Sequence, residues 1–193
     1  MRTNRLERAG ACLAPVLFWV VLAGAPLAAQ DQPRGDVPYV PTPPEVVEEM
    51  LKLGNVKSGD ILYDLGCGDG RIVITAAQKY GARGTGIDLN PVRIKEANEN
   101  ARQAGVADKV RFVEQNLFDA DVHEATVVTL YLLPQVNLKI RPMLLKQLKV
   151  GTRIVSHQFD MGEWEPDKKI DIGWRTVYLW TVTEKAKAQF GDK

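Results

Sequence analysis

Hydrophobic positions follow two different periods along this chain. From Asp60 onward, short apolar runs rich in valine and isoleucine alternate with longer segments in which apolar residues recur at helical spacing. The short runs are typical of buried strands and the longer segments of amphipathic helices. Strands are predicted over 61–65, 84–88, 110–114, 126–132 and 153–158, and helices over 71–80, 91–104 and 138–148. This alternation predicts a parallel, doubly wound sheet in one α/β domain.

The pattern changes near the C-terminus. Two β-like stretches, 171–172 and 175–183, are separated by only two residues. A connection this short predicts an antiparallel hairpin that closes the sheet. We expect the folded domain to span residues 45–185 and the last residues, 186–193, to form a C-terminal tail.

The first 30 residues differ from the rest of the chain. Residues 1–8 contain three arginines, and an apolar run follows over 9–29. This is the layout of a secretory signal, with Ala28 and Ala29 as a cleavage site, although a run of about 20 residues could also span a bilayer uncleaved. In both cases the positive-inside rule places the remaining chain across the membrane. Residues 1–30 therefore predict a signal peptide or an N-terminal membrane anchor, and an exported or anchored product; a buried core helix is the competing interpretation.

The segment that joins this region to the domain is rich in proline and charge. Residues 31–44 predict a linker or arm. Thr42 is expected to cap a helix over 45–53 that Pro43 and Pro44 open, because proline is favoured in the first helical turn.

Composition narrows the classes of function. The chain is 45% apolar and 25% charged, as expected for one globular domain with a buried core. Its formal charge is +1, and beyond residue 30 there are 22 basic against 23 acidic residues, so no nucleic-acid partner is expected. Of the two cysteines, only Cys67 lies beyond that point, which excludes an intramolecular disulfide in the mature domain. No metal-site spacing is present, and the oligomeric state stays open.

The strongest chemical signal lies between the first core strand and its helix. There Asp64 is followed by Gly66, Gly68 and Gly70. Ligands of open α/β sheets bind beyond the carboxyl ends of the strands, where this loop is expected. Glycines allow a tight turn and let the backbone approach a ligand closely. The spacing is GxGxG and not GxGxxG, so the dinucleotide fingerprint is not met.

A second acid, Asp88, ends the next predicted strand. A carboxylate at this position can accept hydrogen bonds from both hydroxyls of a ribose. Asp64 and Asp88 could instead cap helices, and the glycines could serve only as turns. Their occurrence in this order on the expected elements favours a nucleotide-like cofactor. Asn90, before Pro91, is more simply a helix cap.

The segment around Asp64 resembles motif I of SAM-dependent methyltransferases, in which an acid precedes x-G-x-G-x-G. The resemblance implies the class I fold, a Rossmann-like seven-stranded sheet with an antiparallel final strand, and S-adenosylmethionine (SAM) as cofactor. In that family pattern a residue after the third strand holds the adenine amino group. Asn116, with Leu117 beside it, is the candidate here, and Asp119 is the alternative. An asparagine amide oxygen can accept from that amino group, but without a charge.

The methyl acceptor is expected beyond the fourth and fifth strands, where such enzymes usually meet it. Tyr131 and Asn137 follow the fourth strand, and His157 ends the fifth. We take these three as candidate catalytic residues, although Tyr131 could be plain core and His157 a structural histidine. An amine acceptor must be neutral, but free lysine has a pKa of about 10.4 and is therefore charged at pH 7. A desolvated site with acceptors such as Tyr131 or Asn137 would favour the neutral amine.

Several later motifs narrow the resemblance to one branch of the fold. That branch comprises the small lysine methyltransferases acting on the ATP synthase c-subunit and the adenine nucleotide translocase, with their bacterial relatives. The matching segments are 39–42, 64–71, 130–134 and 155–157. The resemblance implies a protein substrate that presents a lysine, at or near a membrane. The lack of a lid-sized insertion also suits a macromolecular acceptor.

Two other functions stay open. One is a small-molecule methyltransferase, and the other is a non-catalytic SAM- or nucleotide-binding domain. The predicted export signal favours the second, because SAM is made in the cytoplasm.

Overall fold

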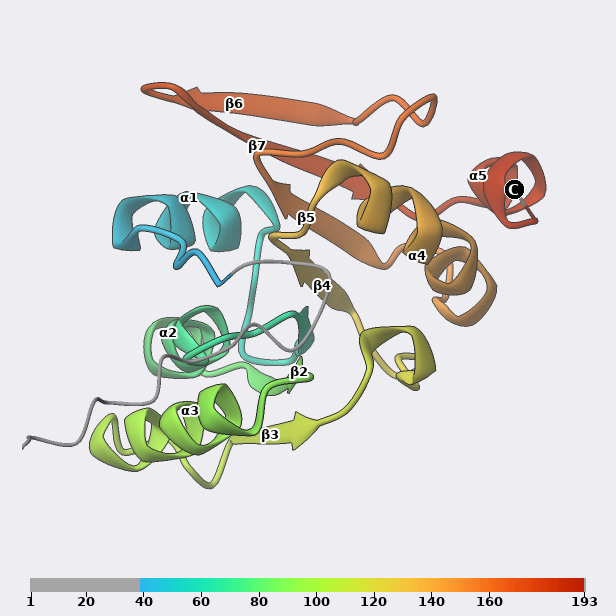
Figure 1. The fold of residues 1–193 in the computed structure, drawn as a ribbon. Helices are drawn as coiled ribbons and strands as arrows, with labels where there is room; N and C mark the ends of the chain where they lie inside the picture. The colour runs from blue at the N-terminus through green and yellow to red at the C-terminus, as the bar shows by residue number, and fades with distance from the viewer. Residues whose placement is uncertain (1–38, 193) are drawn as a thin grey trace, which may run out of the picture. The chain divides into compact units, whose positions relative to one another are not determined.

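The computed structural model describes residues 39–192, which build a seven-stranded sheet (Figure 1). The strands are β1 (Ile61–Leu65), β2 (Arg83–Asp88), β3 (Val110–Glu114), β4 (Val127–Leu130), β5 (Arg153–His157), β6 (Lys168–Ile172) and β7 (Arg175–Thr181). Their order is β3-β2-β1-β4-β5-β7-β6. The first five are parallel, and β7 runs antiparallel to both of its neighbours. The predicted Rossmann-like sheet with an antiparallel final strand is confirmed.

Helices cover both faces of this sheet. They are α1 (Pro44–Leu53), α2 (Arg71–Tyr80), α3 (Pro91–Gln103), α4 (Pro134–Gln147), α5 (Glu184–Phe190) and the short 3-10 helix η1 (Leu117–Asp119). Figure 1 shows α1, α2 and α3 on one side of the sheet and α4 and α5 on the other. The sheet is therefore the middle of three layers, as a parallel sheet with apolar residues on both faces requires.

Alternate strand residues enter two separate cores. Leu62 and Val155 pack with α1 and α2. Leu65, Leu130 and Ile154 pack with α4 and α5 on the opposite face. Because successive strand residues point to opposite faces, nearly continuous apolar runs are needed, and this is why the short runs could be recognised in the sequence.

Thr42 does not cap the first helix, contrary to the sequence prediction. The helix begins at Pro44, its N-cap residue is Pro43, and no side chain caps it. Thr42 therefore lies before the first turn. Its Oγ1 lies instead 3.3 Å from Nδ1 of His157, at the end of β5.

The residues after β7 form a packed helix. The Thr183 side chain caps α5 by accepting from the backbone N–H of Ala186 at 3.1 Å. Phe190 is buried and stacks on Trp164, with 6.2 Å between ring centroids. The segment expected to be a tail, 186–193, thus begins as part of the core.

Two predictions fall on residues that the structure does not describe. The signal or anchor over 1–30 and the first part of the arm lie outside residues 39–192. Within 39–192, none of the helices combines the length and the apolar composition that crossing a bilayer requires.

Candidate functional site

The glycine loop after β1 adopts the left-handed backbone that its composition predicts. Gly66, Gly68 and Gly70 have φ angles of 81°, 53° and 79°. A Cβ atom on Gly68 would lie 2.5 Å from a ring carbon of Tyr39, and one on Gly70 would lie 2.6 Å from the ring of Phe112. The glycines therefore make room for neighbouring protein side chains and allow the tight left-handed turn.

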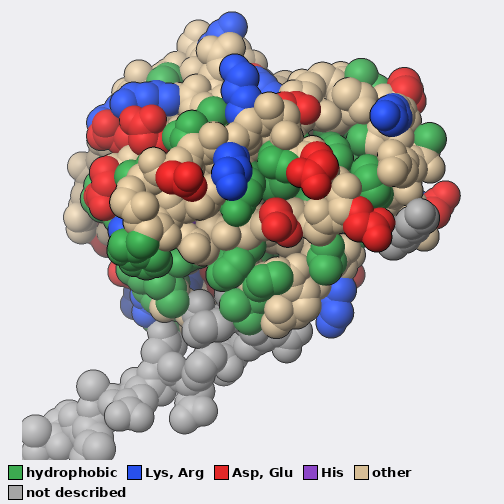
Figure 2. All heavy atoms as spheres, turned by 90° about the horizontal axis from the view of Figure 1, so that it is seen from above, with side chains coloured by type: hydrophobic (Ala, Val, Ile, Leu, Met, Phe, Trp, Pro, Cys, Tyr) green, Lys and Arg blue, Asp and Glu red, His purple; other side chains and the backbone are tan. Residues whose placement is uncertain are grey.

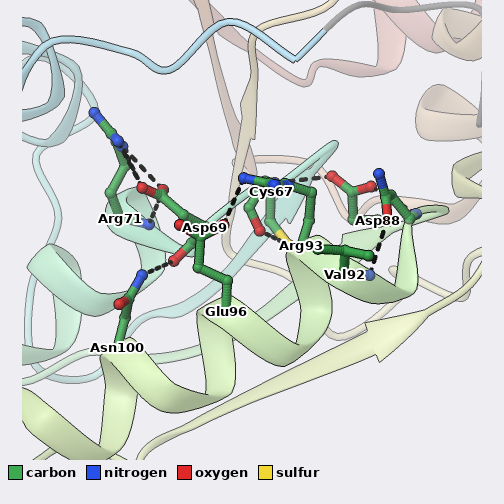
Figure 3. Close-up of polar contacts among 10 residues, drawn as sticks. Cys67, Asp69, Arg71, Asp88, Val92, Arg93, Glu96 and Asn100 are labelled. Atoms are coloured by element: carbon green, nitrogen blue, oxygen red, sulfur yellow. Dashed lines mark hydrogen bonds and ion pairs between the residues drawn. The ribbon is translucent and has the colours of Figure 1, made fainter. Parts of the chain in front are cut away.

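Asp88 holds this loop in place. One carboxylate oxygen, Oδ2, accepts from the backbone N–H of Gly68 at 2.8 Å, and Oδ1 accepts from that of Asn90 at 2.9 Å (Figure 3). Two further loop amides, of Gly66 and Cys67, donate to the carbonyl of Ile87 on β2. Each carboxylate oxygen has a second acceptor site, so Asp88 can also accept from a ribose. Asp88 thus fixes the loop, and its predicted contact with the ribose would use the remaining acceptor sites.

An ion pair between Asp69 and Arg71 stabilises the end of the glycine loop next to α2. The guanidinium of Arg71 contacts the carboxylate of Asp69 at 2.5 Å, and Asn100 donates to the Asp69 carbonyl at 3.0 Å (Figure 3). Burial raises the pKa of Asp69, but the hydrogen bonds from Arg71 outweigh it and hold that pKa below its ordinary value. Arg71 also donates to the carbonyl of Thr42 at 2.9 Å. The loop and the arm are therefore joined by one cation.

The described part of the arm, residues 39–42, crosses the loop. The ring of Tyr39 lies against Gly68, and the guanidinium carbon of Arg93 is 4.5 Å from the centroid of that ring. At its other end, Thr42 reaches His157. The arm thus bridges the glycine loop and the end of β5, a connection that the sequence did not indicate.

Asp64 lies buried beneath the loop and caps no helix. Its Oδ1 accepts from the hydroxyl of Thr129 on the neighbouring strand β4 at 2.8 Å. Burial, with smaller contributions from Asp88 and Asp69, raises the pKa of Asp64 to about 7. Burial therefore favours the protonated form of Asp64.

The candidate adenine residues lie beside Asp88. The backbone N–H of Gln115 donates to the Asp88 carbonyl at 3.0 Å, which brings the end of β3 against the end of β2. Asn116 uses its side-chain oxygen to cap η1, accepting from the N–H of Phe118 at 3.1 Å. Leu117 is partly buried against the core that includes α4. The position suits adenine, and the roles of Asn116 and Leu117 stay predictions.

Tyr131 and His157 meet on the acceptor side. Their ring centroids are 3.9 Å apart, with the planes tilted by 34°. His157 is fully buried, and its Nε2 has no hydrogen-bond partner among the described residues. Burial, with a smaller effect of the Arg175 charge, lowers the pKa of His157 to about 4. The imidazole is therefore neutral at physiological pH.

Asn137, on α4, holds the segment that follows β5. Its amide nitrogen lies 3.2 Å from Oγ of Ser156 and 3.2 Å from the carbonyls of Phe159 and Asp160. Its own oxygen is buried and has no partner within residues 39–192. Asn137 is thus a positioning residue with one unused acceptor.

The backbone turns sharply at Gln158, between His157 at the end of β5 and Phe159. Its φ is 70°, and the N–H of Phe159 donates to the carbonyl of His157 at 2.9 Å. An i to i+2 hydrogen bond around a positive φ is a γ-turn of the rare, strained type. Such strain collects at functional sites. No sequence signal marked this turn, because glutamine has no preference for the left-handed region.

The last two questions concern the thiol of Cys67 and a possible metal site. Burial raises the pKa of the Cys67 thiol well above its ordinary value, so it stays protonated at neutral pH. In the described part of the chain, no three His, Cys, Asp or Glu side chains come close enough to hold a metal ion.

All predicted site residues except Asp64 lie at or beyond the carboxyl ends of the parallel strands. A tight glycine loop after the first strand and an acid with free acceptor sites at the end of the second are the arrangement that binds a nucleotide-like cofactor such as SAM in open α/β sheets. The antiparallel insertion of β7 and the loop held by Asp88 are those of a class I SAM-dependent methyltransferase.

Comparison with known proteins agrees with this class. The family model for the ANTKMT methyltransferase domain matches residues 64–168. A protein-lysine N-methyltransferase of Saccharolobus islandicus is 47% identical over 153 residues, covering 77% of this chain and 95% of the relative. The adenine nucleotide translocase lysine N-methyltransferase of Mus musculus is 32% identical over 174 residues, covering 90% and 75%.

Among solved structures, an RNA methyltransferase from Salinibacter ruber in complex with S-adenosyl-L-homocysteine is 59% identical. It covers 75% of this chain and 95% of its own, with a TM-score of 0.75. The chain belongs to the family of lysine methyltransferases of the adenine nucleotide translocase and the ATP synthase c-subunit, and its cofactor is SAM.

Proposed function

We propose that this enzyme methylates the ε-amino group of a lysine on a protein substrate. The observation that carries the proposal is the neutral, buried acceptor side, where His157 Nε2 and Asn137 Oδ1 both lack a partner within the described chain. Buried polar atoms are nearly always paired, so two unpaired atoms on adjoining elements suit a polar substrate group. The Saccharolobus relative, named as a protein-lysine N-methyltransferase, supports the same acceptor.

A lysine must lose its proton before it can accept a methyl group. Free lysine is neutral in only about one in a few thousand molecules at pH 7. A dry site that adds no negative charge lowers the pKa of the amine by desolvation. The neutral imidazole of His157, with its pKa near 4, and the amide of Asn137 fit this need. In the tautomer that donates Nδ1–H to Thr42 Oγ1, His157 can accept an amine N–H at Nε2, as Asn137 can at Oδ1, and neither stabilises an ammonium ion by charge.

Placement is the other requirement. When bound, SAM supplies the methyl group as an electrophilic carbon on a sulfonium. Tyr131 and His157 stack at the ends of β4 and β5, and Thr42 fixes the His157 ring from the arm. These residues can hold the amine nitrogen in line with that carbon and exclude water. The bound cofactor would supply its methyl group to the amine nitrogen and leave as the neutral thioether, and the proton of the methylated amine would pass to solvent.

We assign the cofactor contacts to the residues at the strand ends. Asp88 holds the ribose, the loop 66–70 approaches the rest of the cofactor, and Asn116 with Leu117 borders the adenine. Asp64 supports the loop from beneath through Thr129. Asp88 and the loop are joined by a hydrogen bond, so cofactor binding and loop geometry depend on each other.

The substrate is proposed to be a protein at or near a membrane. The support is the apolar run over 9–29 behind three arginines, which is typical of an export signal or an anchor. The product is accordingly proposed to be exported or anchored. A reporter enzyme that is active only outside the cytoplasm, fused after Asp36, is expected to be active. Silence there, with activity of a cytoplasmic reporter at the same point, would contradict the export proposal.

RNA is the competing acceptor, because the Salinibacter relative is named as an RNA methyltransferase. RNA binding requires an excess of basic residues along a groove or face. This chain has a formal charge of +1, and Figure 2 shows Lys and Arg side chains interspersed with Asp and Glu on the face viewed. The charge distribution therefore favours a protein acceptor.

The test separates the acceptor classes directly. The purified full chain is incubated with labelled SAM and, in parallel, with a membrane-protein extract, total RNA and a small-molecule extract. Label is expected on lysines of the protein fraction, mapped by mass spectrometry. It should be lost with Asp88→Ala and kept with Asp108→Ala, which removes an exposed carboxylate in the turn before β3, at the opposite edge of the sheet. Label in RNA, in small molecules alone or on carboxylates would contradict the lysine acceptor.

A further inference from the structure

Exposed apolar side chains gather at one edge of the sheet. Within residues 39–192, eight large hydrophobic residues are exposed, and seven lie at the edge where the parallel strands end. We set Leu89 aside because it follows Asp88, the residue proposed to bind the cofactor. The other six, called here the carboxyl rim, are Tyr39, Val40, Val92, Phe118, Leu138 and Trp174.

Three members of the rim follow the carboxyl ends of parallel strands, and Tyr39 and Val40 lie at the glycine loop after β1. Val92 opens α3 after β2, Phe118 lies in η1 after β3, and Leu138 lies near the start of α4 after β4. Tyr39 rests on Gly68 with Val40 beside it. The eighth exposed residue, Val150, lies at the opposite edge, in the turn before β5. Scattered single apolar residues are normal on a protein surface, but a one-sided distribution is not.

Trp174 extends this rim furthest. It is 72% exposed and lies at the tip of the β6–β7 hairpin. His157, the last residue of β5, pairs with Val177 of β7, so Trp174 lies three residues beyond the end of that strand.

Tyr39 and Trp174, the two exposed aromatic residues with a polar group, each lie against the guanidinium of an arginine. The guanidinium of Arg175 lies 4.0 Å from the ring of Trp174, and that of Arg93 lies 4.5 Å from the ring of Tyr39. Tyrosine and tryptophan are enriched where a protein meets the headgroup region of a bilayer. Arginine there can contact lipid phosphates in the geometry it uses for other phosphates. The two pairs therefore have the composition of an interfacial contact.

The chain before the rim brings it near a bilayer. Tyr39 is the first described residue, and only nine residues separate it from the end of the apolar run over 9–29. Nine extended residues span at most about 30 Å. An apolar run held by a membrane would therefore keep Tyr39, at one end of the rim, within that distance of the lipid.

We propose that the carboxyl rim rests on the lipid surface of the membrane that the N-terminal segment engages. The acceptor site then opens toward lysines at the headgroup level. This deepens the proposed function and rests on it only for the meaning of the site, since lipid contact itself requires neither SAM nor an acceptor. Trp174 lies in the interface and the opposite edge, at Val150, faces water.

The test uses the fluorescence of Trp174. The other described tryptophans, Trp164 and Trp180, are buried, so Trp174→Phe removes the exposed emission within residues 39–192. Full chain and variant are mixed with vesicles of phosphatidylcholine and phosphatidylglycerol, with and without brominated acyl chains. The difference between the two proteins is expected to shift to shorter wavelength and to lose most of its intensity with brominated lipid.

A matched control places the probe at the opposite edge. Val150→Trp in the Trp174→Phe background puts a tryptophan at a site that is 52% exposed in the wild type. Its emission should stay at the wavelength of a water-exposed tryptophan and should not be quenched. Failure to associate with vesicles, an unquenched Trp174 or equal quenching at both sites would overturn the proposal. A shift of Trp174 that depends on protein concentration without lipid would assign the rim to a second copy and also overturn it. None of these outcomes bears on methyl transfer.

Discussion

Thr42 and His157, separated by 115 positions in the chain, meet with 3.3 Å between Oγ1 and Nδ1. The contact joins the arm to the end of β5. Through the Thr42 carbonyl and Arg71, the same arm is tied to the glycine loop. The cofactor side and the acceptor side are thus linked by four residues that precede the domain's first helix.

We predict that Thr42→Val impairs catalysis more than SAM binding. The variant leaves His157 Nδ1 buried without a partner, which costs about 1–3 kcal/mol of folding stability. It also allows the imidazole ring to rotate. Thr42→Ser restores the hydroxyl and is the conservative control. The expected result is a fall in kcat that serine rescues, with SAM affinity nearly unchanged, measured by steady-state kinetics and calorimetry. Equal kcat for the valine and serine variants would remove Thr42 from this role.

Asp88→Ala should weaken SAM binding strongly. It removes the acceptor for Gly68 N–H as well as the proposed ribose acceptor. Losing charge-assisted hydrogen bonds of this kind costs roughly 2–4 kcal/mol of binding free energy. Calorimetric titration of the folded variant measures it, with Asp108→Ala, in the exposed turn before β3, as the control. Unchanged affinity in folded Asp88→Ala protein would exclude Asp88 from the cofactor site.

Gly68 offers a sharper test of the loop. Gly68→Ala places a Cβ 2.5 Å from the Tyr39 ring at a φ of 53°. Gly105→Ala imposes similar backbone strain, at a φ of 70°, in open space. Each should cost about 1 kcal/mol of folding stability from the left-handed backbone. Only Gly68→Ala should also displace the arm and lose SAM affinity in a calorimetric titration. A similar loss in Gly105→Ala would show that strain alone matters.

The boundaries that the sequence predicted well are those set by local pattern. Strands β1 and β3 and helix α2 have the predicted limits. Flanking glycines mark the ends of β1 and α2, and the alternation of apolar and polar residues marks β3. Asp64, the three glycines and Asp88 were found because their spacing alone places them on one edge of a parallel sheet.

The features that were missed depend on contacts between distant segments. The arm reaches His157 across most of the chain, and no local period encodes that contact. Helix α5 is short, and its place is fixed by Phe190 against Trp164. The start of α4 was placed too late, although Pro134 opens the helix as proline commonly does.

Two buried groups give opposite pH dependences of folding stability. Asp64 has its pKa raised to about 7, so its contribution is complete below about pH 4 and is lost as the pH rises through 7. His157 has its pKa lowered to about 4, so its contribution is present above about pH 6.5 and is lost as the pH falls through 4. Between about pH 4 and 6.5 the two effects oppose each other.

Replacing either residue alone should therefore reveal the pH dependence of folding stability that the other one causes. Asp64→Asn leaves His157, and the free energy of unfolding should rise with pH, by up to about 1.4 kcal/mol per unit. His157→Gln leaves Asp64, and it should fall. Urea denaturation between pH 4.5 and 6.5 measures both. Parallel curves for the two variants would contradict the opposed titrations.

The central claim is that this carboxyl edge delivers a methyl group from SAM to a lysine nitrogen. The most direct measurement is amino-acid analysis of hydrolysed substrate protein after reaction of the full chain with methyl-labelled SAM. The predicted result is label in Nε-methylated lysine, absent when Asp88→Ala replaces the wild type. Label recovered only as nucleosides, as volatile methanol from esters or not at all would contradict it.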